Sequence, residues 1–305
     1  MKGTADLKHK RVAVIVFSCV LVFCILHWLP SILLAFMYVG GRSDCSFSRT
    51  VSAVNWEMLY QKTIKDIRAR SHVLKTDEDM QLWSTPRGNF WSPSGGVPAE
   101  ALAEEELEVY GSRNLAGVNV GDVVLDCGAD IGLFTREALR EGASLVVAIE
   151  PSASKIRYLR RNFEHEIAQR RVIVCPKGVW NKTESHDFYG MSLVMGNDQA
   201  IPSERVNLVT IDDLMEDLRF SRVDFIKMDI EGAEKQALMG AARTLAKFRP
   251  RLAISCEHYV TDAKDIPRVV SRLGPDYTPE CGPCVRWGSR YYPYVLYFRS
   301  TARRN

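Results

Sequence analysis

Short apolar segments alternate with longer amphipathic segments over the last two thirds of the chain. Three of the apolar segments have the length of buried strands: 122–126, 145–150 and 171–175. The segments between and after them, at about 132–141 and 152–168, have the spacing of amphipathic helices. This alternation is typical of an α/β sheet with helices on both faces, so we predict one α/β domain over residues 101–305.

The same alternation continues to the C-terminus. The further elements that we expect are a meander over 180–195, strands at 206–210, 223–228 and 251–256, helices at 101–110, 211–218 and 234–248, and a terminal antiparallel pair around 291–298. We expect the helix at 101–110 to expose its three consecutive acids, Glu104, Glu105 and Glu106, to solvent.

The first hundred residues follow a different pattern. Residues 12–39 carry no ionised side chain. They exceed the roughly 20 residues that span a bilayer. We therefore predict a single transmembrane segment there, preceded by a basic flank at 1–11. Residues 40–100 are predicted to form a connector and cap, with a helix over 54–67 and a hairpin around 82–91.

The composition and the net charge exclude some classes of partner and of fold. The chain is 46% hydrophobic and 25% charged, as in ordinary globular proteins. A net charge of +3 predicts no nucleic-acid partner. The eight cysteines are scattered, so we expect no disulfide framework. The sequence Cys281-Gly282-Pro283-Cys284 lies in a turn-rich stretch and does not open a helix, so we interpret it as a structural turn and assign no metal ligands.

Two predicted strands end in acids. Asp126 ends the first, and Gly128, Asp130 and Gly132 follow it before a helix begins. Glu150 ends the next strand. Parallel strands bind ligands at their carboxyl ends. The turn lacks the G-x-G-x-x-G spacing of a pyrophosphate site, and its carboxylates favour a ligand with hydroxyls and positive charge.

A third predicted strand, 223–228, runs into the most acidic stretch of the sheet edge. Asp229, Glu231 and Glu234 follow it within six residues. Crowded carboxylates shift one another's pKa values and often mark a functional site. Glu234 near the start of a helix can be explained by the helix dipole. Asp229 and Glu231 have no such structural explanation.

These motifs resemble those of known enzymes. The turn at 126–132 is similar to motif I of Rossmann-like S-adenosylmethionine (SAM) methyltransferases. The segment Ile226 to Glu234, with Thr210-Ile211-Asp212 before it and Glu257-His258 after it, resembles the hallmark of the FkbM family. The resemblance covers about residues 110–260. It implies a Rossmann-like class I methyltransferase that uses SAM and methylates a hydroxyl of a saccharide, lipid-linked glycan or natural product.

The resemblance also assigns roles to residues. It implies that the following residues bind the cofactor: Asp126, Gly128, Asp130, Gly132, Glu150, Gly178, Val179 and Asp229. Trp180 is equally consistent with an adenine contact and with core packing. The base that activates the hydroxyl is expected among Glu231, His258 and Asp229, and we prefer the first two. A divalent cation that acidifies the hydroxyl is an alternative to a base.

The sequence permits two other functions and two membrane orientations. The chain could be a membrane-tethered module that binds SAM without catalysis, or a nicotinamide-dependent oxidoreductase. More Lys and Arg precede the membrane segment than follow it closely, which places the large domain outside the cytoplasm. SAM is made in the cytoplasm, and on that ground we favour the cytoplasmic side, where a hairpin insertion around Pro30 would keep both flanks of the segment. The glycosylation sequon Asn181-Lys182-Thr183 has meaning only in the outward orientation.

Overall fold

The computed structural model describes residue 18 and the ranges 43–111, 117–189 and 203–301. The predicted membrane segment, 12–39, therefore lies outside the described residues apart from Ser18. Within the described ranges, no helix is both long enough and apolar enough to cross a bilayer.

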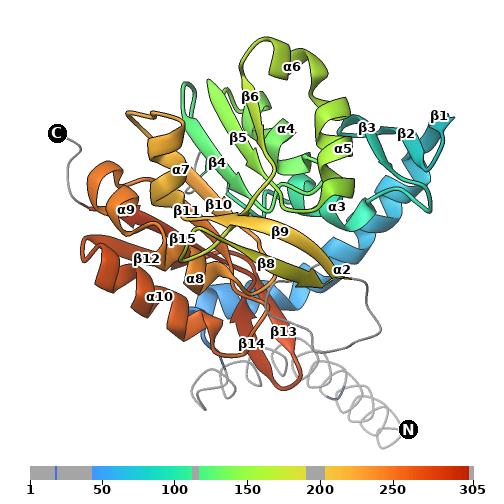
Figure 1. Ribbon diagram of the computed structural model, residues 1–305. Coiled ribbons are helices and arrows are strands. Elements are labelled where there is room, and N and C mark those ends of the chain that lie inside the picture. Colours follow the sequence, from blue (N-terminus) through green and yellow to red (C-terminus); the bar gives the residue numbers. More distant parts are fainter. Residues whose placement is uncertain (1–17, 19–42, 112–116, 190–202, 302–305) are drawn as a thin grey trace, which may run out of the picture.

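A seven-stranded sheet in the order β12-β15-β11-β10-β4-β5-β6 forms the centre of the fold (Figure 1). Its strands are β4 (Val123–Cys127), β5 (Leu145–Ile149), β6 (Val172–Cys175), β10 (Phe225–Met228), β11 (Arg251–Ser255), β12 (Tyr277–Cys281) and β15 (Val295–Ser300). Only β15 runs antiparallel to its neighbours, β11 and β12. This mixed sheet with flanking helices is an α/β fold, as predicted.

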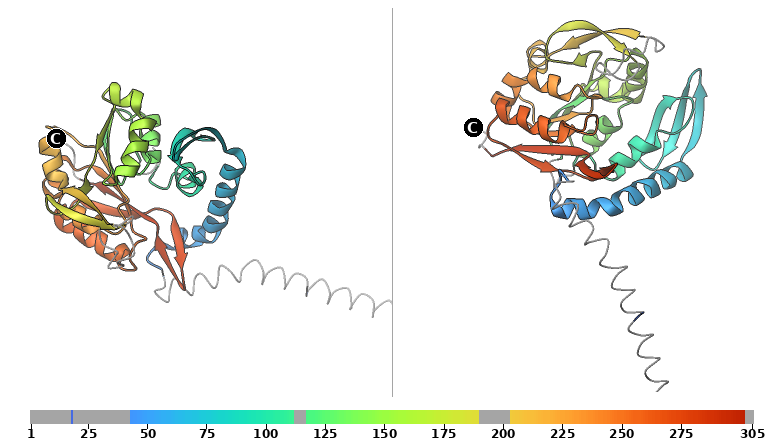
Figure 2. Two further views of the ribbon diagram at one scale, coloured as in Figure 1. Left: turned by 45° about the vertical axis from the view of Figure 1, so that its right-hand side comes forward. Right: turned by 90° about the horizontal axis from the view of Figure 1, so that it is seen from below.

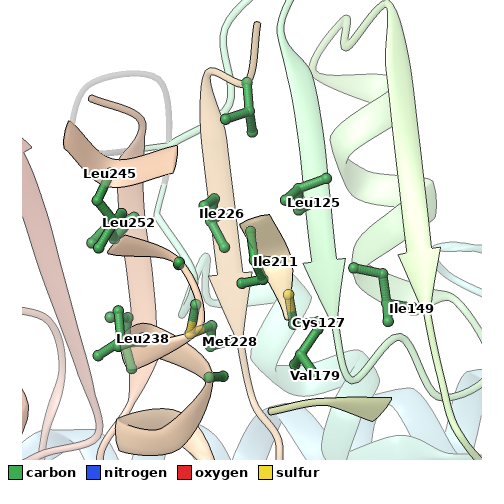
Figure 3. Packing of buried hydrophobic residues seen from close by; sticks show 14 of the residues in the cluster. Leu125, Cys127, Ile149, Val179, Ile211, Ile226, Met228, Leu238, Leu245 and Leu252 are labelled. Atoms are coloured by element: carbon green, nitrogen blue, oxygen red, sulfur yellow. The ribbon is translucent and has the colours of Figure 1, made fainter. Parts of the chain in front are cut away.

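Helices cover both faces of this sheet (Figure 2). They are α3 (Ala99–Glu106), α4 (Leu133–Arg140), α5 (Ala153–Asn162), α6 (Glu164–Ala168), α7 (Ile211–Asp217), α8 (Glu234–Met239), α9 (Ala242–Phe248) and α10 (Asp262–Leu273). Leu125, Cys127 and Ile226 pack toward α8 and α9 (Figure 3). Val124 and Phe225 pack against α4 on the opposite face. Both faces of the strands are buried, which explains their continuous apolar sequences.

The connector contains the helix and the hairpin that we expected, with one more strand. Helix α2 (Phe47–Arg70) runs beside an antiparallel sheet of β1 (His72–Asp77), β2 (Met80–Thr85) and β3 (Gly88–Pro93). Ile64 and Ile67 of α2 pack with Phe90 of β3 and Leu102 of α3. Strand β1 was not predicted, because nearly all of its side chains are exposed and it has no apolar alternation.

Two predicted helices are broken in the structure. The helix expected at 152–168 divides at Phe163 into α5 and α6. The helix expected at 234–248 divides into α8 and α9 around Gly240. There the backbone carbonyl of Trp180 comes so close that a Cβ on Gly240 would lie 2.1 Å from its oxygen. The close approach of another segment at that glycine therefore accompanies the helix break.

The terminal antiparallel pair was predicted in the wrong place. Tyr291 belongs to β14 (Arg290–Pro293), which pairs with β13 (Cys284–Trp287) in a separate hairpin. Strand β15 instead inserts between β11 and β12. Its first four residues are all buried, as an internal strand requires. Of the predicted meander, 180–195, the structure describes one strand, β8 (Glu184–Tyr189), and residues 190–195 lie outside the described ranges. Strand β8 pairs with β9 (Ser203–Val209), the strand expected at 206–210, and β9 also pairs with β7 (Gly178–Val179).

The cysteine prediction was wrong in one respect. Cys45, just before α2, forms a disulfide with Cys284 at the start of β13. The two residues are 239 positions apart, so no local spacing in the sequence indicated the pair. A β-bridge between Ser43 and Tyr291 lies beside it. Together these contacts join the chain that leaves the predicted membrane segment to the C-terminal hairpin.

Candidate active site

A cavity of about 240 Å³ opens at the carboxyl ends of β4, β5 and β10. Seven of the predicted site residues line it: Gly128, Asp130, Glu150, Gly178, Val179, Asp229 and Glu231. The structure thus brings together residues from four separate segments at one edge of the sheet. Asp126, Gly132 and His258 do not line the cavity and lie behind or beside it.

The two glycines of the first turn are required by close packing. Gly128 has a φ of +79°, and a Cβ there would lie 1.9 Å from the carbonyl oxygen of Asp229. Gly132 has a φ of +96°, and its Cβ would lie 2.2 Å from the ring of Phe163. Side chains at these positions would be strained and would clash, so the turn after β4 can pack against Asp229 and Phe163 only with glycine at both positions.

Glu150 is held rigidly at the cavity wall. Its side chain is only 3% exposed. One carboxylate oxygen accepts a hydrogen bond from the backbone N–H of Asp130 (3.0 Å), and the other accepts one from Ser152 (2.9 Å). Burial raises the pKa of Glu150. Each oxygen can accept a second hydrogen bond, so Glu150 suits a ligand that presents hydroxyl groups.

Asp126 supports the cavity from behind. It is fully buried, and its Oδ2 accepts a hydrogen bond from the hydroxyl of Thr135 (2.6 Å). Its Oδ1 lies 3.4 Å from Nζ of Lys227, which donates to the carbonyl of Gly128 (2.8 Å). Burial alone would lower the pKa of Lys227, but Asp126 and Asp229 outweigh it and raise the pKa. Lys227 is therefore a buried cation that ties β10 to the glycine turn.

His258 lies among three carboxylates. Its Nε2 is 3.3 Å from Oδ1 of Asp229 and 3.4 Å from Oε1 of Glu234. Its Nδ1 is 3.7 Å from Oε2 of Glu231. Burial opposes the charged imidazolium, but Asp229 and Glu234 outweigh it and raise the pKa of His258 to about 11. The imidazole is then protonated at neutral pH and has no site that accepts a proton.

The same cluster has the composition of a metal site. Asp229, Glu234 and His258 each place one ligand atom within 4.8 Å of the others. A divalent cation at this position would have to displace the proton from Nε2 of His258, because a metal ligates only neutral imidazole. In the absence of a cation, protonated His258 places the positive charge between the two carboxylates.

Glu231 is the carboxylate that combines access with a shifted pKa. Its backbone has a positive φ of 56°, and its side chain lines the cavity and is 43% exposed. Burial and then repulsion from Asp229 raise its pKa. Of the two preferred bases, Glu231 is the one that can accept a proton from a ligand in the cavity.

Three contributors to the site were missed in the sequence. Tyr110 donates a hydrogen bond to Oδ2 of Asp229 (2.7 Å), and Lys155 pairs with Asp130 (2.9 Å). Glu104 lines the cavity, and burial raises its pKa to about 7. Lys227 was missed as well, although the sequence did indicate it as a charged residue inside an otherwise apolar strand.

The acidic helix was predicted wrongly in part. Glu106 is exposed as expected, but Glu105 is buried and Glu104 is half-buried. Helix α2 packs against α3, and Tyr60 of α2 reaches Glu104. The burial of this acidic face depends on a helix some forty residues away in the sequence, so the local pattern could not indicate it.

The two remaining predictions near the site concern Trp180 and the sequon. Trp180 packs against Val206 and Leu208 and does not line the cavity, which agrees with core packing. Nδ2 of Asn181 donates a hydrogen bond to Gln236 (2.6 Å). The atom that a glycan would need is therefore engaged in the folded protein.

Comparison with known proteins gives one family match. Residues 126–279 match the family described as the methyltransferase FkbM domain. Among curated proteins none matches. One similar solved structure is the methyltransferase FkbM from Methylobacillus flagellatus KT, with 25% identity, 65% of this chain and 50% of that chain covered, and a TM-score of 0.49. This chain thus spans about half the length of that protein.

Two other similar structures have lower identity. One is a putative rRNA methylase from Clostridium thermocellum, with 9% identity, 67% of this chain and 97% of that chain covered, and a TM-score of 0.41. The other is Trm5 from Methanocaldococcus jannaschii in complex with adenosine, with 12% identity, 76% of this chain and 58% of that chain covered, and a TM-score of 0.43.

Proposed function

The chain belongs to the FkbM methyltransferase family, and from this premise we propose that it transfers a methyl group from SAM to a hydroxyl. The acceptor we propose is a saccharide, a lipid-linked glycan or a natural product. Residues 12–39 would anchor the enzyme in a membrane. The observation that carries the proposal is the acidic cavity at the carboxyl ends of β4, β5 and β10.

The cavity residues suit the parts of SAM. Buried Glu150 can accept hydrogen bonds from the two ribose hydroxyls. Gly178 and Val179, both buried at the cavity wall, offer an apolar surface for adenine. The carboxylate of Asp229 faces the same cavity and favours the positive charges of the methionine part. When bound, SAM supplies a methyl group on a positively charged sulfur.

The residues of this chain then orient and activate the acceptor. Holding a hydroxyl in line with the methyl group can lower the barrier by about 7–11 kcal/mol. Glu231 would accept the hydroxyl proton, which contributes roughly 10²–10⁴-fold. His258 would keep Asp229 and Glu231 in place as the shared cation.

Transfer of a radiolabelled methyl group from SAM into glycan, lipid and metabolite extracts tests this function. Glu231→Gln should reduce transfer by at least about 100-fold while SAM binding is retained. Transfer at the wild-type rate would remove Glu231 from the base role. Binding of SAM without transfer to any acceptor would support the alternative of a binding module.

The family match and the first turn argue against the alternative of a nicotinamide-dependent oxidoreductase. The turn after β4 has no G-x-G-x-x-G spacing, and Asp130 adds a carboxylate where a pyrophosphate would bind. Titration calorimetry with SAM and with NADH distinguishes the two, since we expect heat of binding from SAM alone.

We infer that the catalytic domain faces an oxidising compartment. The supply of SAM favoured the cytoplasmic side, but the Cys45–Cys284 disulfide supports the opposite side. Disulfides persist in secretory and extracellular compartments and are rare in the cytosol. The basic flank at 1–11 supports the same orientation. SAM would then have to reach the domain across the membrane.

A further inference from the structure

A second cavity, of about 360 Å³, lies between α2 and the C-terminal hairpin. Trp56 and Tyr60 of α2 form one wall, and Glu257 and Tyr294 line it from the ends of the sheet. We propose that this cavity binds the acceptor, and that the acceptor carries a positively charged amine beside the hydroxyl that is methylated. The inference rests on the proposed function, because it concerns the second substrate of that reaction.

The second cavity adjoins the first. The hydroxyl of Tyr294, which lines the second cavity, donates a hydrogen bond to Glu104 (2.7 Å), which lines the first. The hydroxyl of Tyr60 approaches the same carboxylate (3.4 Å). Glu257 directly precedes His258, whose ring contacts Asp229. Only a few side chains thus lie between the two cavities, and we infer that a ligand in the second reaches past them to present its hydroxyl to the first.

The side chains around the second cavity are mostly acidic, which favours a positively charged ligand. Glu57 and Glu257 line it and Glu104 forms its shared wall, whereas Arg286 is its one basic lining residue. Within the described ranges, none of these three carboxylates has a Lys, Arg or His nitrogen within 4 Å. Glu104 and Glu257 are half-buried, and burial raises the pKa of each to about 7, because the charged carboxylate is costly there without a cation beside it. A ligand with an ammonium group would supply that cation, and an anionic ligand would be repelled.

The aromatic residues favour the same class of ligand. The rings of Trp56 and Tyr60 are stacked, with centroids 6.1 Å apart and an interplanar angle of 12°. Tyr294 lines the cavity from the other side. Faces of tryptophan and tyrosine attract quaternary and protonated amines, and they also cover the apolar groups next to the charge. Aromatic side chains combined with carboxylates therefore point to an amino alcohol as the group that is recognised.

A pair of isosteric probes tests the charge directly. Choline has a hydroxyl and a quaternary nitrogen, and 3,3-dimethyl-1-butanol has the same shape with a neutral carbon in place of the nitrogen. We would titrate each into the full-length protein in detergent, saturated with S-adenosylhomocysteine, and measure binding by NMR. We expect choline to bind at least tenfold more tightly than the neutral alcohol.

Variants of the lining residues test whether choline binds in the second cavity. Trp56→Leu and Glu257→Gln should each weaken choline binding at least fivefold, and retained binding of S-adenosylhomocysteine shows that each variant is folded. Glu164→Gln, on the exposed α6 and outside both cavities, should not change it. Equal affinity for the two probes, or full choline binding in both cavity variants, would overturn the inference while leaving the proposed function intact. Failure of the protein to bind S-adenosylhomocysteine would overturn both.

Discussion

Replacing His258 with glutamine tests whether this residue is a structural cation or a base. The imidazole joins Asp229 and Glu234 through contacts of 3.3 and 3.4 Å, and its side chain is only 11% exposed. Glutamine keeps an amide donor of similar reach but removes the positive charge. His258→Gln therefore leaves two neighbouring carboxylates without the cation between them.

The magnitude follows from burial and from the contacts that remain. Removing one partner of a buried ion pair costs about 3–5 kcal/mol. Glu234 is 1% exposed and keeps its hydrogen bonds from the backbone of Ile230 and Gly232, whereas Asp229 is 29% exposed and keeps Tyr110. We therefore expect His258→Gln to lower the free energy of unfolding by the smaller of these amounts, about 3 kcal/mol. For a domain of this size that loss lowers Tm by roughly 6–12 °C.

The stabilisation that His258 contributes depends on pH and decreases as the pH rises. The pKa of His258 is raised to about 11 in the folded protein, above roughly 6.5 for an unfolded histidine. Its stabilisation is therefore fully present below pH ~6.5 and is lost as the pH rises toward 11, by at most about 1.4 kcal/mol per pH unit. The difference in Tm between wild type and His258→Gln should be largest near pH 6.5 and should shrink by pH 9.5.

Thermal unfolding at the two pH values measures this effect, with Glu231→Gln as the matched control. Glu231 faces the same ring at 3.7 Å but is 43% exposed, so its loss should cost at most about 1 kcal/mol. His258 is not the structural cation if His258→Gln and Glu231→Gln have the same Tm within error at pH 6.5. The same conclusion follows if the difference in Tm between wild type and His258→Gln grows with pH.

Three further predictions concern the glycine turn, the disulfide and the metal question. Gly128→Ala should abolish SAM binding in calorimetry, because its Cβ would lie 1.9 Å from the carbonyl oxygen of Asp229; unchanged affinity would show that the turn tolerates a side chain. Loss of the Cys45–Cys284 disulfide, by Cys45→Ser or by reductant, should destabilise the domain by roughly 2–5 kcal/mol in thermal unfolding. Labelling of both thiols without prior reduction would contradict the pair. Because protonated His258 supplies the positive charge in its cluster, EDTA should not change turnover, and loss of activity restored by Mg²⁺ or Mn²⁺ would argue for a metal there.

The parts of the fold that were predicted correctly are those that local sequence determines. Strand β5 is an apolar run, β4 is apolar up to Asp126, and β10 is apolar except for Lys227; acids lie in or directly after these strands near their carboxyl ends. Parallel strands bring their carboxyl ends to the same edge of a sheet. The positive φ values of Gly128 and Gly132 follow from the turn that must reverse the chain there. The acidic edge of the sheet was therefore visible before any tertiary contact was known.

The parts that were missed depend on segments distant in the sequence. The insertion of β15 between β11 and β12 is a choice of pairing partners, and its apolar sequence fits an internal position in any sheet. The disulfide joins Cys45 to a residue 239 positions away. Glu104 faces the site because α2 covers α3. The charge state of His258 likewise depends on Glu234 and Asp229, which follow a different strand.

Titration of SAM into the full-length protein in detergent, followed by calorimetry, tests the central claim most directly. The acidic cavity at the ends of β4, β5 and β10 predicts binding of SAM with no binding of NADH. It also predicts that Glu150→Ala, which removes the buried carboxylate between Asp130 and Ser152, weakens SAM by at least about tenfold, the equivalent of one lost hydrogen-bonding pair. Absence of SAM binding, or wild-type affinity in Glu150→Ala, would contradict the assignment of this cavity as the SAM site.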